Sequence, residues 1–517
     1  MKNTGEMKVK KGRKTGHGLG SSVSLSAVGL LIMLFLPWLV YQNGAGAVWI
    51  AIGAYIGIVL VWQLFSYRLM RFSLQQEGVV TLPGFFHQRF MEKLPIFRTF
   101  LALVLVGLLL FAATALLYGL GSYAKTIFKI DPWIVKTGIL VLSFVLFLVM
   151  GRKGFRLADR WLAFVVLGAL ILINLSILRL LGGEGVLKNI FFSWASGSVS
   201  EYVNAEYYGG QSLTVSQHIS MLSFGLLILG SPLVLQRLQQ AENGKTVQVS
   251  RRWGIIFSLL SLFCAIFAGG MLRAALYPAK INSMEDFFHQ LFLEVPKSGI
   301  VFYTTCLLFL VTAALVVFEV VHSCMLQASQ ILHDDLLSPL TEFAKRRLPK
   351  RPEGEKTLSK NATLKIFAII AYLGVGVTAI IAEEGIYGVV LEAVIIVASG
   401  LAPVTLLALH CGRMNLAGTW TGFFCGCTVA AVWDLLAVFS KNGQSETLKE
   451  ILGFHGIIPA MALGLLFGFV VAKITKAPKQ EILEAYDQVK YRYVTSDEDW
   501  LAESQEKMRR IFRRNEK

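Results

Sequence analysis

A glutamate and a histidine lie three residues apart inside one long apolar stretch of the chain. Glu319 and His322 fall within residues 299–332, where Glu319 is the only acidic residue and no lysine or arginine occurs. A carboxylate at the centre of a membrane costs about 3 kcal/mol or more unless it is paired, hydrated or neutralised. Residues at positions i and i+3 share a helical face, so His322 can pair with Glu319 or relay a proton to it. This pair therefore indicates ion or proton coupling within a membrane, although a structural ion pair with His322 or with a basic residue of a neighbouring helix is the other interpretation.

The composition places this pair in a polytopic membrane protein. Of the 517 residues, 55% are hydrophobic and only 16% are charged, whereas soluble domains carry about 25% charged residues. Apolar runs long enough to cross a bilayer recur along the chain, so we expect an all-α protein embedded in lipid. Twelve transmembrane spans are predicted, at about residues 23–42, 47–67, 99–120, 134–151, 159–181, 217–236, 254–274, 299–332, 363–382, 386–410, 418–440 and 454–475.

Basic residues predict the orientation of these spans. The net charge is +16, and the basic clusters fall in every second connecting segment, as at residues 10–14, 152–153, 251–252 and 345–347. Because lysine and arginine concentrate in cytoplasmic loops, we expect a multi-pass protein of the cell membrane with both termini in the cytosol. The same placement explains the charge without a nucleic-acid partner.

Three connecting segments have features of their own. Residues 81–90 predict a short amphipathic helix near the lipid headgroups. Residues 182–216 form the largest outer loop and are rich in aromatic side chains, so this loop is either a lid or an interfacial cap. The tail from about residue 476 is charged, and we expect it to be partly helical and solvated.

The sixth span contains residues that interrupt a helix. Gly230, Ser231 and Pro232 follow one another in the middle of this span. A proline there removes a backbone hydrogen bond, and freed backbone groups are tolerated in a membrane where they line a cavity or meet protein. Interrupted helices often form the substrate site of secondary transporters, and the alternative is an ordinary proline kink.

Motifs of enzymes do not appear in the sequence. There is no Walker-type glycine-rich loop, no G-x-S-x-G nucleophile motif, and no cluster of histidine, cysteine and acidic residues with metal-ligand spacing. The prediction is therefore a protein that is not an enzyme and has no cofactor apart from a possible coupling ion, sodium or a proton.

Several segments resemble the sodium:solute symporter family, which includes bacterial proline permease and the sodium/glucose cotransporters. Residues 81–90 read TLPGFFHQRF, close to the family pattern T-L-P-[DE]-[FY]-F-x-x-R-[FY]. Gly230-Ser231-Pro232 with the downstream Arg237 resembles a second motif, and Ala402-Pro403, Arg413 and Gly418-x-x-x-Gly422 resemble a third. The matches occur in family order over about residues 20–440, and the chain resembles a divergent member.

The resemblance implies a leucine-transporter-type fold built from two inverted five-helix repeats. The expected organisation is a basic N-terminal tail (1–22), a first repeat (23–181), an outer loop (182–216), a second repeat (217–410), two peripheral helices (411–475) and a C-terminal tail (476–517). Substrate would bind near the middle of the membrane between spans 1 and 6. Low-ranking candidates for contacting it are Phe224, Gly230, Ser231 and Pro232.

The chain departs from the family at the sodium site. The resemblance places backbone carbonyls of Leu25, Val28 and Val316 at this site, and it places Glu319 and Val320 where the family has two hydroxyl side chains. Valine supplies no side-chain oxygen, whereas hard cations prefer oxygen ligands. These positions are therefore doubtful sodium ligands, and Glu319 becomes the candidate for coupling to sodium or to a proton.

Two hypotheses follow from the sequence. The first is a symporter-like secondary active transporter that moves a small organic solute by alternating access. The alternative is a non-transporting sensor or partner subunit that retains the symporter fold and acts through a separate partner protein.

Overall fold

The structure is a computed structural model, and it describes residues 16–75, 81–92, 94–180, 202–276, 286–287, 299–337, 360–381, 386–441 and 444–490. The basic clusters at 10–14 and 345–347 and most of the aromatic outer loop lie outside the described residues. The same is true of the tail beyond Lys490, so the predictions for these segments stay untested.

The described part of the chain is almost entirely helical. In its first half the elements are α1 (Gly16–Leu30), η1 (Leu31–Phe35), α2 (Leu36–Asn43), η2 (Ala45–Ala47), α3 (Val48–Leu64), α4 (Ser66–Gln75), α5 (Leu82–Phe90), α6 (Ile96–Phe128), α7 (Pro132–Leu180), β1 (Tyr207–Tyr208), β2 (Gln211–Ser212), α10 (Val215–Leu222), α11 (Phe224–Leu229) and α12 (Pro232–Leu238). In its second half they are α13 (Gly244–Leu276), α15 (Ile300–Ile331), η4 (Leu332–Leu337), α17 (Lys360–Ile381), α18 (Ile386–His410), α19 (Leu416–Leu435), β3 (Ala437–Lys441), β4 (Gln444–Thr447), α20 (Leu448–Leu452), α21 (Ile457–Ile474) and α22 (Gln480–Lys490).

Most predicted spans correspond to these helices, but the fourth and fifth lie in one helix, α7, so the predicted connecting segment 152–158 is helical. Ten helical segments of the described residues are long and apolar enough to cross a membrane. A bent pair formed by α10–α11 and α12 takes the place of the sixth span, and a shorter apolar helix, Ile366–Ala379, takes the place of the ninth. The prediction of an all-α membrane protein with about twelve spans is confirmed.

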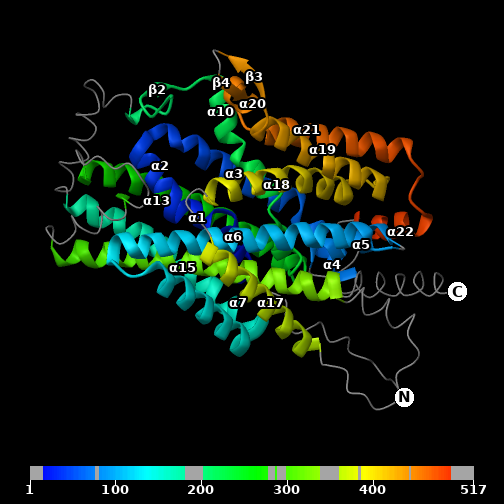
Figure 1. Cartoon of the computed structure of the whole chain (residues 1–517), viewed down its shortest axis with the longest axis horizontal. Coiled ribbons are helices and arrows are strands. Elements are labelled where there is room, and N and C mark those ends of the chain that lie inside the picture. The colour runs from blue at the N-terminus through cyan, green and yellow to red at the C-terminus, as the bar shows by residue number, and fades with distance from the viewer. Residues whose placement is uncertain are drawn as a thin grey trace.

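The long helices run side by side in one bundle (Figure 1). Helices α6 and α15 pack against each other through its middle, α18, α19 and α21 lie together on one side, and α7 and α17 lie on the other. The β1–β2 hairpin lies at one end of the bundle, whereas α4, α5 and α22 lie at the opposite end, called here the α22 end.

The first span is interrupted by a π-helical turn. This turn, η1, lies between α1 and α2, and Pro37 follows it at the second position of α2. A proline cannot donate to the carbonyl four residues earlier, and its ring crowds that carbonyl, so the helix widens locally. The first span is therefore widened near its middle but stays one continuous helical segment, Gly18–Asn43, whereas the sixth span is broken.

The sixth span breaks where the glycine and proline predict. Helix α11 ends at Leu229, Gly230 and Ser231 follow, and Pro232 begins α12 at an angle of 46° to the preceding pair. The break does not leave Gly230 facing open space, because a Cβ there would lie 2.3 Å from the carbonyl oxygen of Ala398 on α18. The break is thus packed directly against the tenth span.

The helix predicted over residues 81–90 exists, and it is packed into the protein. Helix α5 begins at the N-cap Thr81, whose hydroxyl accepts from the amide of Gly84. Most of its side chains are buried, and Arg89 donates to the carbonyls of Ala408 (3.0 Å) and Cys411 (3.3 Å). Burial lowers the pKa of Arg89 to about 10. The helix packs into the protein because carbonyls at the end of α18 need donors that a loop helix can supply.

The beginning of the C-terminal tail is also packed rather than solvated. Helix α22 places Tyr486 against Phe72 of α4 and under the guanidinium of Arg89, 4.8 Å from the ring centroid. Gln75 of α4 donates to the carbonyl of Ala485 (3.3 Å) and to Gln488 (2.8 Å). The sequence prediction of a partly helical tail is confirmed here, whereas its solvation is contradicted by the burial of Tyr486.

Candidate functional site

Glu319 forms a buried ion pair with a residue of the broken sixth span. Arg237, in the last turn of α12, donates to Glu319 Oε1 and to the hydroxyls of Ser323 and Ser22. It also donates to the backbone carbonyl of Ser22 at 2.9 Å, and Ser323 donates to Glu319 Oε1 at 2.9 Å. Ser22, Arg237, Glu319 and Ser323 are all buried, and together they are called the charged cluster. It joins three helices, α1, α12 and α15.

Each helix is held in register for these contacts. On α1, Ser21 accepts from the indole of Trp253 (2.9 Å) and Ser24 donates to the carbonyl of Gly254 (3.0 Å), so both flanking serines are bound to α13. On α12, Gln236 donates to Gln330 of α15 at 3.2 Å. These hydrogen bonds fix α1 to α13 and α12 to α15, and Arg237 bridges the two pairs.

The electrostatics of the cluster depend on both partners. The charges of Arg237 and Glu319 sum to zero, and the oxygens of Ser22 and Ser323 accept further hydrogen bonds from the guanidinium. Breaking a buried pair by removing one partner leaves an uncompensated charge, at a cost of about 3–5 kcal/mol. The cluster is therefore stable when α1, α12 and α15 are together, and strongly sensitive to their separation.

His322 makes its hydrogen bonds on a different side of α15. Its Nδ1 lies 2.8 Å from the hydroxyl of Ser143 on α7 and 3.4 Å from the hydroxyl of Tyr372 on α17, and these hydroxyls are 2.7 Å apart. Ser143, His322 and Tyr372 are called the hydroxyl network. The structure thus brings Glu319 and His322 onto one helix, as the sequence indicates, while giving them partners on different helices.

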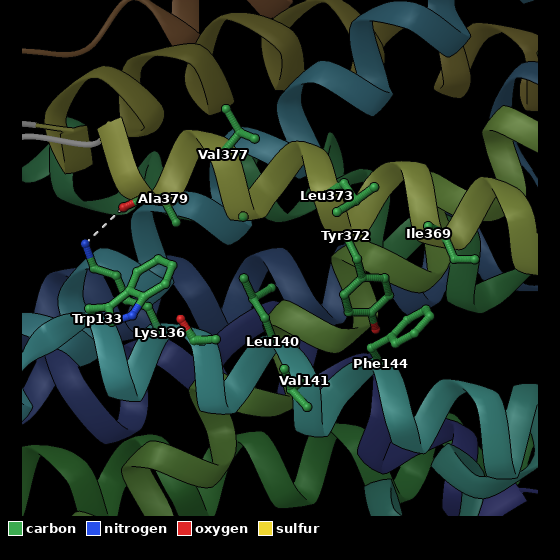
Figure 2. A pocket seen from close by; sticks show the side chains of 12 residues that line it. Trp133, Lys136, Leu140, Val141, Phe144, Ile369, Tyr372, Leu373, Val377 and Ala379 are labelled. Carbon is green, nitrogen blue, oxygen red and sulfur yellow. Dashed lines mark hydrogen bonds between the residues drawn. The ribbon is translucent and has the colours of Figure 1, made fainter.

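Tyr372 of the hydroxyl network lines an apolar cavity of about 370 Å³ between α7 and α17 (Figure 2). Tyr372 points from α17 toward Phe144 of α7, and the two rings are 5.2 Å apart at an interplanar angle of 62°. Near one end of the cavity, Lys136 donates to the carbonyl of Ala379 at 3.0 Å. Several side chains that line this cavity, such as Leu373 and Val377, are exposed on the outside of the bundle. The cavity therefore opens toward lipid.

The five positions aligned with a sodium site are mostly apolar. Leu25, Val28, Val316 and Val320 are buried hydrophobic residues, and a Cβ on Gly29 of α1 would lie 3.2 Å from Cγ1 of Val316. Helices α1 and α15 are in side-chain contact here. Glu319 provides the side-chain carboxylate at these positions, and Arg237 is bound to it.

The residues predicted to contact substrate are only partly open. Gly230 and Pro232 are buried, whereas Phe224 and Ser231 are half-buried. A second cavity, of about 310 Å³, lies instead beside η1, the π-helical turn of the first span. Its lining includes Leu34 of η1, Tyr123 of α6 and Val317 of α15, and the four predicted residues are not among its lining.

The second cavity is closed on one side by a tyrosine. The hydroxyl of Tyr387, near the start of α18, lies where a Cβ on Gly119 of α6 would be, at 1.3 Å from that position. Any larger residue at position 119 would displace this ring. Glycine at 119 therefore allows α18 to approach α6 beside the cavity.

Sequence reasoning did not assign roles to three members of the charged cluster. Arg237 appeared only as part of a motif, and Ser22 and Ser323 were not singled out. The available signal was the spacing, because Ser323 follows Glu319 by four residues and Arg237 follows the proline break by five. A buried acid requires a basic partner, and an arginine one turn and a half beyond a helix break was a candidate.

Fold and site together define a class of protein before any comparison. A bundle of apolar helices whose sixth span is broken near its middle and whose first span carries a π-helical turn is typical of a secondary transporter. A sequence model of the sodium:solute symporter family matches residues 11–426, so the chain belongs to that family.

Individual relatives agree with this assignment. The chain is 24% identical over 482 residues to a sodium/proline symporter of Staphylococcus aureus, covering 90% of this chain and 87% of the relative. Its fold is similar to that of a Na⁺-coupled sialic acid symporter solved in a substrate-bound, outward-open state, with a TM-score of 0.68, 15% identity, and coverage of 91% of this chain and 92% of the other. It is also similar to Mhp1, a nucleobase-cation-symport-1 family transporter, with a TM-score of 0.51, 12% identity, and coverage of 92% and 97%.

The leucine-transporter-type fold expected from the sequence is therefore confirmed, and the chain is a multi-pass membrane protein. Family and fold make it a secondary active transporter of the symporter type. They do not favour the alternative of a non-transporting sensor or partner subunit.

Proposed function

We propose that the protein carries a small organic solute across the cell membrane by alternating access, and that Glu319 is the carboxylate through which transport is coupled to an ion. The observation that carries this proposal is the charged cluster. A carboxylate within a membrane span is expensive and usually functional, and this one pairs with Arg237 of α12, which in turn donates to Ser22 of α1.

The proposed movement changes the contacts of the cluster. In transporters of this type, one helix group rocks against another around a site near the midplane. Because Arg237 bridges α12 to α1 and α15, a displacement of the first and sixth spans relative to α15 must stretch or break its bonds. The free energy of this ion pair would then differ between the conformations, which is the requirement for coupling.

The solute is proposed to be of amino-acid size. The cavity beside η1 has a volume of about 310 Å³, which is near the lower limit for ligand-binding sites. The curated relatives include sodium/proline symporters. A thermal-shift screen of purified protein against amino acids, sugars, carboxylates and vitamins would identify the solute, with proline as the first compound.

For orientation we propose that the α22 end faces the cytosol. The basic residues Arg251 and Arg252 lie near the start of α13, a helix that contacts α4 at this end of the bundle, and such residues concentrate on the cytoplasmic side. Because α1 and α22 both begin near that end, both termini would be cytosolic.

The test of Glu319 uses a matched control carboxylate. Glu392 of α18 also pairs with a base, Lys449 at 3.0 Å, but this pair is partly exposed and lies near the end of the helix. In proteoliposomes containing the purified protein, we expect Glu319→Gln to abolish uphill accumulation of the identified solute, whereas Glu392→Gln retains it. Accumulation by Glu319→Gln at the rate of the wild type would show that Glu319 does not couple transport.

A further inference from the structure

Four oxygen atoms converge on the guanidinium of Arg237 from two helices. They are the carbonyl and hydroxyl oxygens of Ser22 on α1, and Glu319 Oε1 and the Ser323 hydroxyl on α15. A carboxylate, two hydroxyls and a backbone carbonyl form the kind of oxygen set that also binds a hard metal cation. All three side chains that supply these oxygens are buried, so the set is not part of the solvated surface.

The charge of this set decides which cation it can hold. Glu319 contributes one negative charge, and Arg237 contributes one positive charge, so the cluster is neutral as built. A sodium ion added beside Arg237 would leave one uncompensated positive charge in the interior of the membrane region. Such a charge is expensive, and the two cations would also repel each other at close range.

We propose that Arg237 is a tethered cation that occupies the cation site between α1 and α15, so that this transporter works without sodium. This inference rests on the proposed transport function and goes beyond it, because the family name indicates sodium. Arg237 itself belongs to a family motif, and the departure in this chain is Glu319, which gives the guanidinium a buried carboxylate partner. Arg237 is fixed to α12 and cannot leave the protein, so the positive charge at this site is not carried across the membrane with the solute. Of the two coupling ions considered, the proton remains.

The apolar neighbours of the site agree with this assignment. Val316 and Val320 lie one turn before and one residue after Glu319, and both are buried without a side-chain oxygen to offer. Val320 therefore supplies no side-chain oxygen where the resemblance expects a hydroxyl ligand for sodium. The planar fork of a guanidinium matches the carboxylate, the hydroxyls and the carbonyl already in place.

The proposal predicts that removing the guanidinium opens the site to sodium. In Arg237→Ala the cluster keeps its oxygens and carries one negative charge, which a sodium ion can neutralise. Arg237→Lys keeps the positive charge at a similar position. In the double variant Arg237→Ala/Glu319→Ala the charge is absent again, so sodium should have no partner.

The experiment measures the melting temperature of purified protein in sodium chloride and in choline chloride at equal ionic strength. Ligands that bind the folded state raise its melting temperature. We expect the same melting temperature in both salts for the wild type, for Arg237→Lys and for the double variant. We expect a sodium-dependent rise for Arg237→Ala alone.

Two results would overturn the proposal. The first is a sodium-dependent rise for the wild type, which needs no variant to fold. The second is a folded Arg237→Ala protein whose melting temperature is the same in both salts. Neither of these melting-temperature results depends on transport. Failure of the proposed transport function would instead appear as absence of solute uptake under every gradient. The experiments therefore distinguish failure of this proposal from failure of the proposed function.

Discussion

The charged cluster and the hydroxyl network are two polar sites on one helix, and they differ in what they join. The charged cluster connects α15 to α1 and α12, which belong to the first and sixth spans. The hydroxyl network connects α15 to α7 and α17, and the pair Thr114–Thr378 (2.6 Å) similarly connects α6 to α17. A buried ion pair therefore links α15 to the first and sixth spans. Hydrogen bonds between hydroxyl groups link α15 and α6 to α7 and α17.

The difference indicates which contacts change during transport. A buried ion pair has a large free energy that is lost when its partners separate. A hydrogen bond between hydroxyls contributes only about 1 kcal/mol, which is sufficient to hold helices that stay together. We interpret α6, α7, α15 and α17 as one group of helices that stay together during transport. The charged cluster connects this group to the first and sixth spans.

The largest effect is expected from breaking the ion pair on one side only. Arg237→Gln leaves Glu319 buried without its partner, and we expect a loss of about 3–5 kcal/mol in the free energy of unfolding, seen as a lower melting temperature. Arg237→Gln/Glu319→Gln should lose less than the sum of the two single variants, because the second change removes the unpaired charge. Additive losses would show that the two residues do not form a pair, and would remove the charged side of the comparison.

A smaller effect is expected in the hydroxyl network. Tyr372→Phe removes the hydroxyl that lies 2.7 Å from Ser143, at a cost of about 1 kcal/mol, and solute accumulation should remain close to that of the wild type. His322→Gln is the companion variant, because His322 is predicted from the sequence to take part in coupling. If either variant abolished accumulation as Glu319→Gln is expected to, the hydroxyl network would belong to the coupling machinery and the comparison would be wrong.

The sequence predicted the helices well because each signal is local. The apolar spans follow from length and composition, the break in the sixth span from Gly230 and Pro232, and the start of α5 from Thr81 and Pro83. The family motifs supplied the arrangement of these spans in space, which periodicity alone does not contain.

The partners of the buried polar residues were not predictable in the same way. Glu319 and Arg237 are 82 residues apart, and their contact depends on the angle at which α12 leaves the break. For His322, spacing correctly placed it near Glu319 on α15, but the partners on α7 and α17 depend on helix rotation. The burial of Tyr486 was missed for a related reason, since a charged tail is usually solvated unless a complementary surface exists elsewhere in the fold.

Solute uptake under defined ion gradients tests the central claim most directly. Proteoliposomes containing the wild type are given an inward sodium gradient, an inward proton gradient, or neither, and accumulation of the solute identified in the thermal-shift screen is measured. With Arg237 as the tethered cation, accumulation should follow the proton gradient and be unchanged when choline replaces sodium. Accumulation that requires the sodium gradient would contradict the account.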